Sequence, residues 1–453
     1  MESASIFVCL ALVASTASGQ TLSGYSQIDY VHSQESVDQL NDANGQPLNQ
    51  NRVLIRRTRL KLAQQWRMLE YAVEADFNTV SGPQVGLRHV EVALNWPPVE
   101  PPVAAVAVAA AVPDAGAAAI EAAAGLDGGS TEAVAIEQAP PLKPRFPVSF
   151  RLGAGMFRAP FGHDVYELSN AERLFAEPSM LLQAFYPGEF DLGVRLTFAW
   201  RGLGVVVAMQ NGEPIGERSF PGRDPNDAKD YFVRATARAE VTPRVTVEGG
   251  ASTTVGTGFH AGTPATKDVL VWRDLNEDGV AQLTEIQAIR GSSATSSENF
   301  NRWGVGGDLR VKIGLPLGQL LLFGEAATAT NLDRGIRPAD PVLLGRAQRS
   351  LAAFGGFTQD IFSHGLIGVR VDYYAAALDQ SQLQAGTLVR SSETFINYSF
   401  AAAFRFVGPQ FVGGRGRVLV DYTLKQDPLG RDAAGRPADL RNDVFTVRLQ
   451  LEI

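Results

Sequence analysis

The chain has 453 residues, of which 45% are hydrophobic, and a formal net charge of −8 at pH 7. A globular protein of this length would comprise two or three domains, whereas a large closed β-barrel uses the same length as one unit. The net negative charge argues against nucleic acid as a partner. The single cysteine excludes a disulfide framework. No segment contains the eighteen or so consecutive apolar residues that a membrane-spanning helix needs.

Residues 1–19 are predicted to be a signal peptide. Residues 6–14 form an apolar core, and the small residues that follow end at Gly19, which suits a cleavage site. The region before this core lacks Lys and Arg, which is atypical of signal peptides. We therefore expect residues 20–453 to be exported towards the bacterial outer membrane.

Alternation of apolar and polar residues with period two is the recurring local pattern. In segment 231–241, apolar residues alternate with Arg234, Thr236, Arg238 and Glu240. Such runs reach about ten residues, the span of a tilted membrane strand, whereas globular strands average five or six. Charges also recur inside the runs, as a polar lumen requires, and a soluble β-sandwich is the alternative. The predicted strands are 21–32, 53–65, 70–79, 87–96, 147–158, 190–201, 203–212, 230–241, 244–256, 299–313, 317–330, 346–360, 365–376, 393–407, 414–426 and 443–453.

The links between these strands predict the topology. Most links after even-numbered strands are short, and those after odd-numbered strands are longer, as in barrels with periplasmic turns and external loops. Trp66, Trp96 and Trp200 end strands that run towards the periplasm, where aromatic rings favour the membrane interface. The predicted fold is an all-β transmembrane antiparallel barrel of about sixteen strands, with short periplasmic turns and long extracellular loops.

Residues 97–147 break this pattern, because a long Ala- and Pro-rich segment of low complexity stands where a short turn is expected. We interpret it as a periplasmic insertion with too few large apolar side chains to pack.

Replacing residues 99–145 by a short glycine-containing turn should therefore leave folded barrel in the outer membrane. A heat-modifiable band on gels measures this outcome, and its loss in the variant would show that the insertion is structural.

Several segments of the first half resemble the phosphate-selective porin O and P family. They are residues 53–62 (VLIRRTRLKL), 71–77 (YAVEADF), 153–162 (GAGMFRAPFG), 172–173 (ER), 188–194 (GEFDLGV) and 206–212 (VVAMQNG). The resemblance implies a sixteen-stranded porin, passive diffusion of solutes and a homotrimer. Phosphate-binding members carry constrictions rich in Lys and Arg. Here the link 163–189, the expected infolded loop, has Arg173 as its one strong base beside five carboxylates.

Alternation places many bases on the lumenal face, although the whole chain is acidic. Rings of arginine in a narrow water-filled channel favour anions over cations, so an anion preference is predicted. The alternative is that these bases pair with neighbouring carboxylates and only brace the wall. The candidate pore-lining residues are Arg57, Arg59, Lys61, Arg195, Arg234, Arg238, Arg310, Lys312, Arg370 and Arg405.

The predicted extracellular loop 257–299 contains a calcium-loop motif. Asp274, Asn276, Asp278 and Glu285 match the D-x-N-x-D-G-x5-E spacing, and Val280 would offer its backbone carbonyl. In this spacing the first three oxygens gather on one side and the glutamate can bind bidentately. The motif predicts bound Ca²⁺; a solvated acidic turn is the alternative.

These features together predict an outer-membrane porin in the lipid bilayer, which needs no cofactor for transport of small hydrophilic solutes and prefers anions. One alternative is a calcium-stabilised surface barrel that binds a partner and does not conduct. Another is an outer-membrane hydrolase. It is disfavoured because the five histidines show no metal-ligand spacing and no G-x-S-x-G segment accompanies them.

Overall fold

The structure is a computed structural model of the chain. It describes residues 20–34, 40–41, 43–44, 46–80, 82–98, 148–214, 224–274, 276–384, 387–390, 393–407, 415–431, 437–440 and 442–452. The predicted signal peptide and residues 99–147 of the predicted insertion lie outside these residues.

Sixteen antiparallel strands form a closed barrel, in which each strand pairs with the next along the chain and the last pairs with the first. The prediction of a sixteen-stranded antiparallel barrel is confirmed, and each predicted strand matches one strand of the barrel. The barrel strands are β1 (Gln20–Ser33), β2 (Asn51–Trp66), β3 (Leu69–Asn78), β4 (Gln84–Trp96), β5 (Val148–Arg158), β6 (Phe190–Trp200), β7 (Leu203–Gln210), β8 (Asp230–Thr242), β9 (Val245–His260), β12 (Glu298–Leu315), β13 (Gly318–Thr330), β14 (Arg349–Ile361), β15 (Gly365–Ala376), β18 (Glu393–Val407), β19 (Arg415–Gln426) and β22 (Val444–Glu452).

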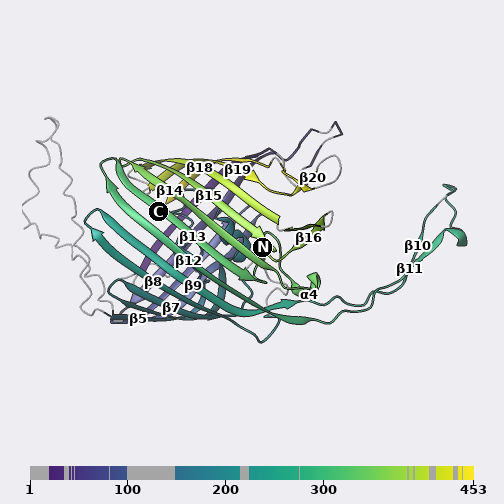
Figure 1. The fold of residues 1–453 in the computed structure, drawn as a ribbon, viewed down its shortest axis with the longest axis horizontal. Coiled ribbons are helices and arrows are strands. Elements are labelled where there is room, and N and C mark those ends of the chain that lie inside the picture. Colours follow the sequence, from purple (N-terminus) through teal and green to yellow (C-terminus); the bar gives the residue numbers. More distant parts are fainter. Residues whose placement is uncertain are drawn as a thin grey trace, which may run out of the picture.

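The remaining elements lie in the links between barrel strands. A long arm leaves β9 and β12 and ends in the hairpin of β10 and β11, well away from the barrel (Figure 1). None of the helices in the described ranges is long and apolar enough to cross a membrane. The elements in the links between barrel strands are α2 (Gly162–Tyr166), α3 (Met180–Phe185), β10 (Val269–Trp272), η1 (Leu283–Glu285), β11 (Ile286–Ile289), α4 (Pro341–Leu344), β16 (Ser381–Gln384), β17 (Thr387–Arg390), β20 (Gly430–Arg431) and β21 (Pro437–Ala438).

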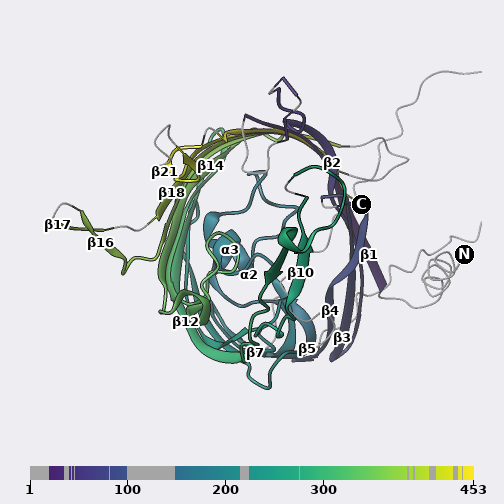
Figure 2. The same ribbon diagram turned by 90° about the vertical axis from the view of Figure 1, so that its right-hand side faces the viewer.

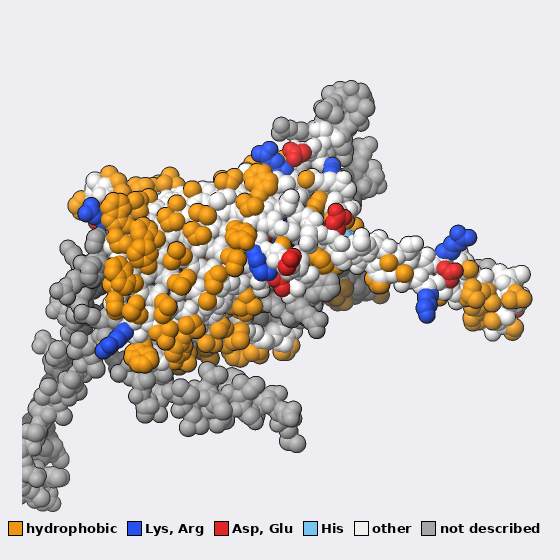
Figure 3. All heavy atoms as spheres, turned by 90° about the horizontal axis from the view of Figure 1, so that it is seen from below, with side chains coloured by type: hydrophobic (Ala, Val, Ile, Leu, Met, Phe, Trp, Pro, Cys, Tyr) orange, Lys and Arg blue, Asp and Glu red, His pale blue; other side chains and the backbone are white. Residues whose placement is uncertain are grey.

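Alternation gives the barrel an apolar outer face and a polar inner face. On β12, Val305 and Leu309 are exposed on the outside, whereas Asp308 between them is buried on the inside. Apolar side chains cover much of the outer surface (Figure 3). Trp66 and Trp96 end β2 and β4 and are exposed at the rim where most short turns lie. The 79–83 link between β3 and β4 is also short, although it follows an odd-numbered strand.

Residues 159–189, here called the infolded loop, enter the lumen and carry α2 and α3 inside the barrel (Figure 2). The loop buries Phe161, Val165 and Phe185 against inward side chains such as Ala327 and Tyr374. Small inward residues on β13 and β14 leave room for these rings. The lumen is therefore narrowed by a packed segment of the chain itself.

Candidate functional site

The first anchor of the infolded loop is at the start of α2. The Glu325 carboxylate on β13 accepts the backbone N–H groups of His163 and Asp164, both at 3.0 Å. Ser252 Oγ on β9 accepts the N–H of Gly162 at 3.0 Å. Gly162 has a φ of 65°, and a Cβ there would lie 1.7 Å from Glu325 Oε1. Close approach to the wall therefore requires glycine at this position.

Strands β15, β19 and β22 also hold the loop, through arginines that donate to its backbone carbonyls. Arg417 on β19 donates to Ala171 O at 2.9 Å, and Arg448 on β22 donates to Ala176 O at 3.1 Å. Arg370 on β15 donates to Glu177 O at 3.1 Å. The loop is therefore tied to the wall on both sides of the lumen, so its path across the barrel is set by several strands.

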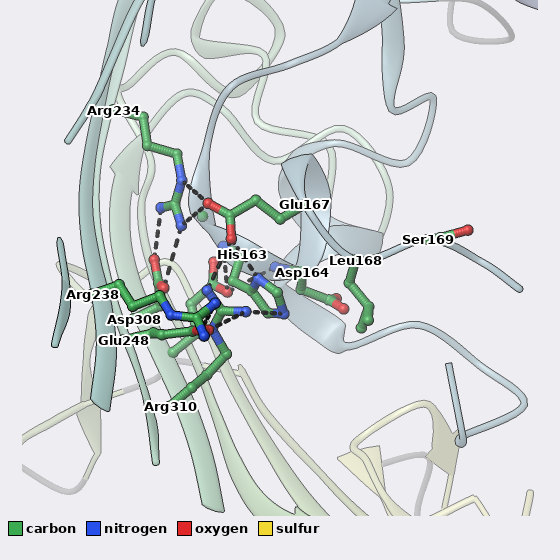
Figure 4. A network of polar contacts seen from close by, with 12 residues as sticks. His163, Asp164, Glu167, Leu168, Ser169, Arg234, Arg238, Glu248, Asp308 and Arg310 are labelled. Carbon is green, nitrogen blue, oxygen red and sulfur yellow. Dashed lines mark hydrogen bonds and ion pairs between the residues drawn. The ribbon is translucent and has the colours of Figure 1, made fainter. Parts of the chain in front are cut away.

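Glu167 is the centre of a charge network between the loop and the wall (Figure 4). Its carboxylate is 2.8 Å from Arg234 Nη2 and 2.9 Å from Arg310 Nη2, and His163 Nδ1 lies at 2.9 Å. Arg234 also binds Asp308 at 2.6 Å. Burial alone would raise the pKa of Glu167, but the hydrogen bonds and charges of His163 and Arg234 lower it to about 2. The loop carboxylate is thus ionised at neutral pH.

A second network crosses from the first strands of the barrel to the loop. Glu91 on β4 is almost fully buried and binds Arg151 at 2.8 Å and Arg195 at 2.7 Å. Arg195 also donates to the Tyr166 hydroxyl of the loop at 2.8 Å. Between this wall and the loop lies a hollow of about 470 Å³, here called the β1–β6 hollow, lined by Lys61 among others. Charged side chains therefore border the free space beside the loop.

The structure places all ten predicted pore-lining bases on the inner face. Arg57 faces inward because it lies opposite Gln27 in the register of β1 and β2. The side chain of Gln27 is buried inside the barrel, where it donates to Asn170 O of the loop. Neither Arg57 nor Lys61 forms a hydrogen bond or ion pair with any residue of the described ranges, whereas the other eight bind carboxylates. These eight are Arg59 (Asp76), Arg195 (Glu91), Arg234 (Asp308), Arg238 (Glu248), Arg310 (Glu248), Lys312 (Glu248), Arg370 (Asp372) and Arg405 (Asp360). Bracing of the wall, the alternative left open by the sequence, thus describes most of these contacts.

Alternation along β2 would place Arg56 on the outer face, yet its side chain binds partners inside the lumen. The register between β1 and β2 shifts after Gln27, so Arg56 has no partner on β1 and behaves as the extra residue of a bulge. Arg56 binds Asp29 at 3.0 Å and Glu177 of the loop at 2.6 Å. The sequence could have indicated this bulge through the adjacent Arg56 and Arg57, because two neighbouring charges do not fit a strand with one apolar face.

The calcium motif forms a compact turn at the end of the arm. Asp274 accepts the backbone N–H groups of Asp278 at 3.1 Å and Gly279 at 2.8 Å, and Asn276 Oδ1 accepts that of Asp278 at 3.2 Å. The Glu285 carboxylate accepts the indole N–H of Trp272 at 3.0 Å. Across the described part of the chain, no three His, Cys, Asp or Glu side chains are grouped as a metal site. The turn gathers Asp274, Asn276 and Asp278, while Glu285 faces the hairpin.

No sequence model of a protein family matches the chain, and no curated protein matches it. Among solved structures, the chain is similar to OmpT, an outer membrane protein of Vibrio cholerae, with 9% identity over 97% of this chain and 99% of that chain and a TM-score of 0.48. It is also similar to an anion-selective porin from Comamonas acidovorans, with 9% identity, 96% and 98% coverage and a TM-score of 0.47. Pseudomonas putida OprB gives 11% identity, 96% and 94% coverage and a TM-score of 0.44. Structural similarities this distant carry no argument about the function of the chain.

Proposed function

We propose that the protein is a porin of the bacterial outer membrane, through which small hydrophilic solutes diffuse passively without a cofactor. The observation that supports this most directly is a closed barrel, apolar outside, with a charged lumen narrowed by an infolded loop. A wall of this kind satisfies every backbone group within the bilayer and leaves the polar side chains to water. The resemblance of the first half to the phosphate-selective porin O and P family points to the same class.

Conductance in planar lipid bilayers tests this proposal. Purified protein refolded in detergent should produce discrete steps of current across the bilayer, whereas denatured protein should produce none. A barrel that is heat-modifiable on gels yet adds no current would instead favour a surface receptor, the second class of function. The homotrimer that the resemblance implies is a further proposal, and light scattering of the detergent complex measures its mass.

We propose a weak preference for anions, set mainly by Arg57 and Lys61 of β2. Neither side chain forms an ion pair with a carboxylate in the described ranges, so their charges act on passing ions more strongly than those of the paired arginines do. Changing Arg57 and Lys61 together to glutamine should shift the reversal potential in a salt gradient towards cations. Arg201 is a matched control, because it stacks on Trp200 in a turn at the rim, and Arg201→Gln should leave the potential unchanged. A wild-type preference for cations would contradict the proposal.

Calcium binding by the arm is a separate proposal. It is supported by the motif spacing, in which the Val280 carbonyl and Glu285 are the further ligands, and by a turn that gathers Asp274, Asn276 and Asp278. Extracellular calcium modules bind with a Kd on the order of 10⁻⁴–10⁻³ M, so millimolar Ca²⁺ should be tested. Such a divalent ion would offset the repulsion between the carboxylates of the turn.

Calcium is therefore expected to protect residues 271–290 from protease on intact cells, and chelation should expose them. Replacing Asp274 and Asp278 by alanine should abolish the protection without changing conductance. Asp268→Ala, in the arm but outside the motif, is the matched control and should keep it. Equal cleavage of the wild type with calcium and with chelator would identify the segment as an acidic turn only.

A further inference from the structure

A second hollow lies between the infolded loop and the opposite wall, on the side of the barrel with the short turns. Its volume is about 240 Å³, and it is lined from β12, β13, β14, β15 and β18 as well as from the loop. We call it the β12–β18 hollow. Its lining differs from that of the β1–β6 hollow, because Leu321, Phe323 and Phe354 of the wall face it beside Leu174 and Phe175 of the loop.

These apolar side chains form a continuous aromatic floor. The Phe323 ring lies 6.4 Å from that of Phe175 and 6.2 Å from that of Phe354, centroid to centroid. The docked loop buries its own Leu174 and Phe175, whereas Leu321, Phe323 and Phe354 are only partly buried. The loop therefore leaves an apolar surface open within a lumen whose other walls are charged. A flat apolar group that covered this floor would release water from it.

The guanidinium group of Arg405 lies beside this apolar lining of the hollow. The Arg405 side chain is 44% exposed, and its single polar contact within the described ranges is Asp360 at 3.0 Å. Arg310 also borders the hollow, and its Nε is buried without a hydrogen-bond partner in those ranges. A planar guanidinium presents paired N–H donors that match a carboxylate.

The carboxylates of the lining limit the charge of a ligand. Asp164 is occupied by Arg173, whereas Glu172 is exposed and Asp360 stands beside Arg405. A second negative charge on the ligand would meet Glu172 and Asp360 at close range, which opposes dianions such as hydrogen phosphate. The aromatic floor, the single accessible guanidinium and these acids together select a monoanion with a flat apolar body.

We propose that the β12–β18 hollow is a binding station for small aromatic monocarboxylates that pass through the lumen. This inference rests on the proposed pore and names the solute class that the pore holds longest. The ring lies on Phe323 and Phe354, and the carboxylate accepts hydrogen bonds from Arg405. Inorganic phosphate and short aliphatic acids lack one of these two features.

Benzoate, acetate and benzyl alcohol are the probes of this proposal, because the last two each carry half of the benzoate molecule. Benzoate should reduce the chloride current in planar bilayers at concentrations at least tenfold below those needed with acetate or benzyl alcohol. Arg405→Gln should raise the half-blocking concentration about tenfold, the loss expected for one charge-assisted contact. Phe354→Leu, which keeps an apolar side chain, should raise it by a smaller factor.

Lys425 is the matched control, because it faces the same lumen from β19 but lies outside the hollow. Lys425→Gln removes an equal charge and should leave the benzoate block unchanged. The proposal is overturned if benzoate and acetate block equally, or if Arg405→Gln and Lys425→Gln weaken the block alike.

Isothermal titration of the detergent-folded protein with benzoate separates this site from the pore. Binding that depends on Arg405 in a barrel without conductance would overturn the porin function but keep the site. Conductance without such binding would keep the porin and overturn the site.

Discussion

Replacing Asp29 by alanine is expected to lower the free energy of unfolding of the barrel by about 3–5 kcal/mol, the usual cost of stranding a buried charge. Asp29 is fully buried on β1 and binds Arg448 of β22 through both carboxylate oxygens, at 2.7 and 2.8 Å. It also binds Arg56 of β2 at 3.0 Å. One carboxylate thus joins the first strand to both of its neighbours at the closure of the barrel. Chemical denaturation of the detergent-folded protein measures the change.

Glu240→Ala is the control for this prediction. Glu240 is 74% exposed and lies 3.7 Å from Arg238, so its removal should cost less than about 1 kcal/mol. Changing Arg448 to methionine in the Asp29→Ala background removes one of the stranded charges and should restore part of the stability. Equal losses for Asp29→Ala and Glu240→Ala would show that burial of the pair contributes nothing.

Protonation of the carboxylates of the infolded loop at low pH is expected to weaken the attachment of the loop to the barrel wall and to change the ion selectivity of the lumen. Burial would raise the pKa of Glu189, but the charges of Arg158 and Arg173 bring it to about 2, close to that of Glu167. An unfolded glutamate titrates near 4.3, so each folded pKa is depressed. The stabilisation from each group is therefore complete above about pH 5 and is lost as the pH falls towards 2. Because Glu167 is partly exposed to water, screening limits its share of this stabilisation to about 1 kcal/mol.

Loss of these charges should make the lumen more anion-selective. Glu167 faces Arg234 of β8 and Arg310 of β12, and neutralising it leaves both guanidinium groups with more uncompensated charge. The reversal potential should move towards anions as the pH is lowered below 4, together with noisier current as the loop loosens. Glu167→Gln should produce part of this shift already at pH 7.

Asp268→Asn is the control, because Asp268 precedes β10 in the arm, outside the lumen, and accepts the N–H of Gly291. A much smaller shift is expected from it at pH 7. A reversal potential that stays constant from pH 7 to pH 2.5 in the wild type would contradict the prediction.

The sequence by itself determined the barrel, the number of its strands and the inward position of the ten candidate pore-lining bases. Alternation is a property of neighbouring residues, so the inward position of Arg234 or Arg370 follows from a few residues of context. The same reasoning failed at Arg56, where a register shift against β1 turns two adjacent arginines inward. A bulge depends on the partner strand, and the sequence of β2 does not specify that partner.

Only the tertiary structure decided which charges are paired and where the free space lies. Asp29 and Arg448 are separated by almost the whole chain and meet because the barrel closes. Glu167 reaches Arg234 and Arg310 because the loop folds inward onto β8 and β12, with Gly162 against Glu325. Ion pairing depends on distances of a few ångströms between strands, and composition and period carry no information on such distances.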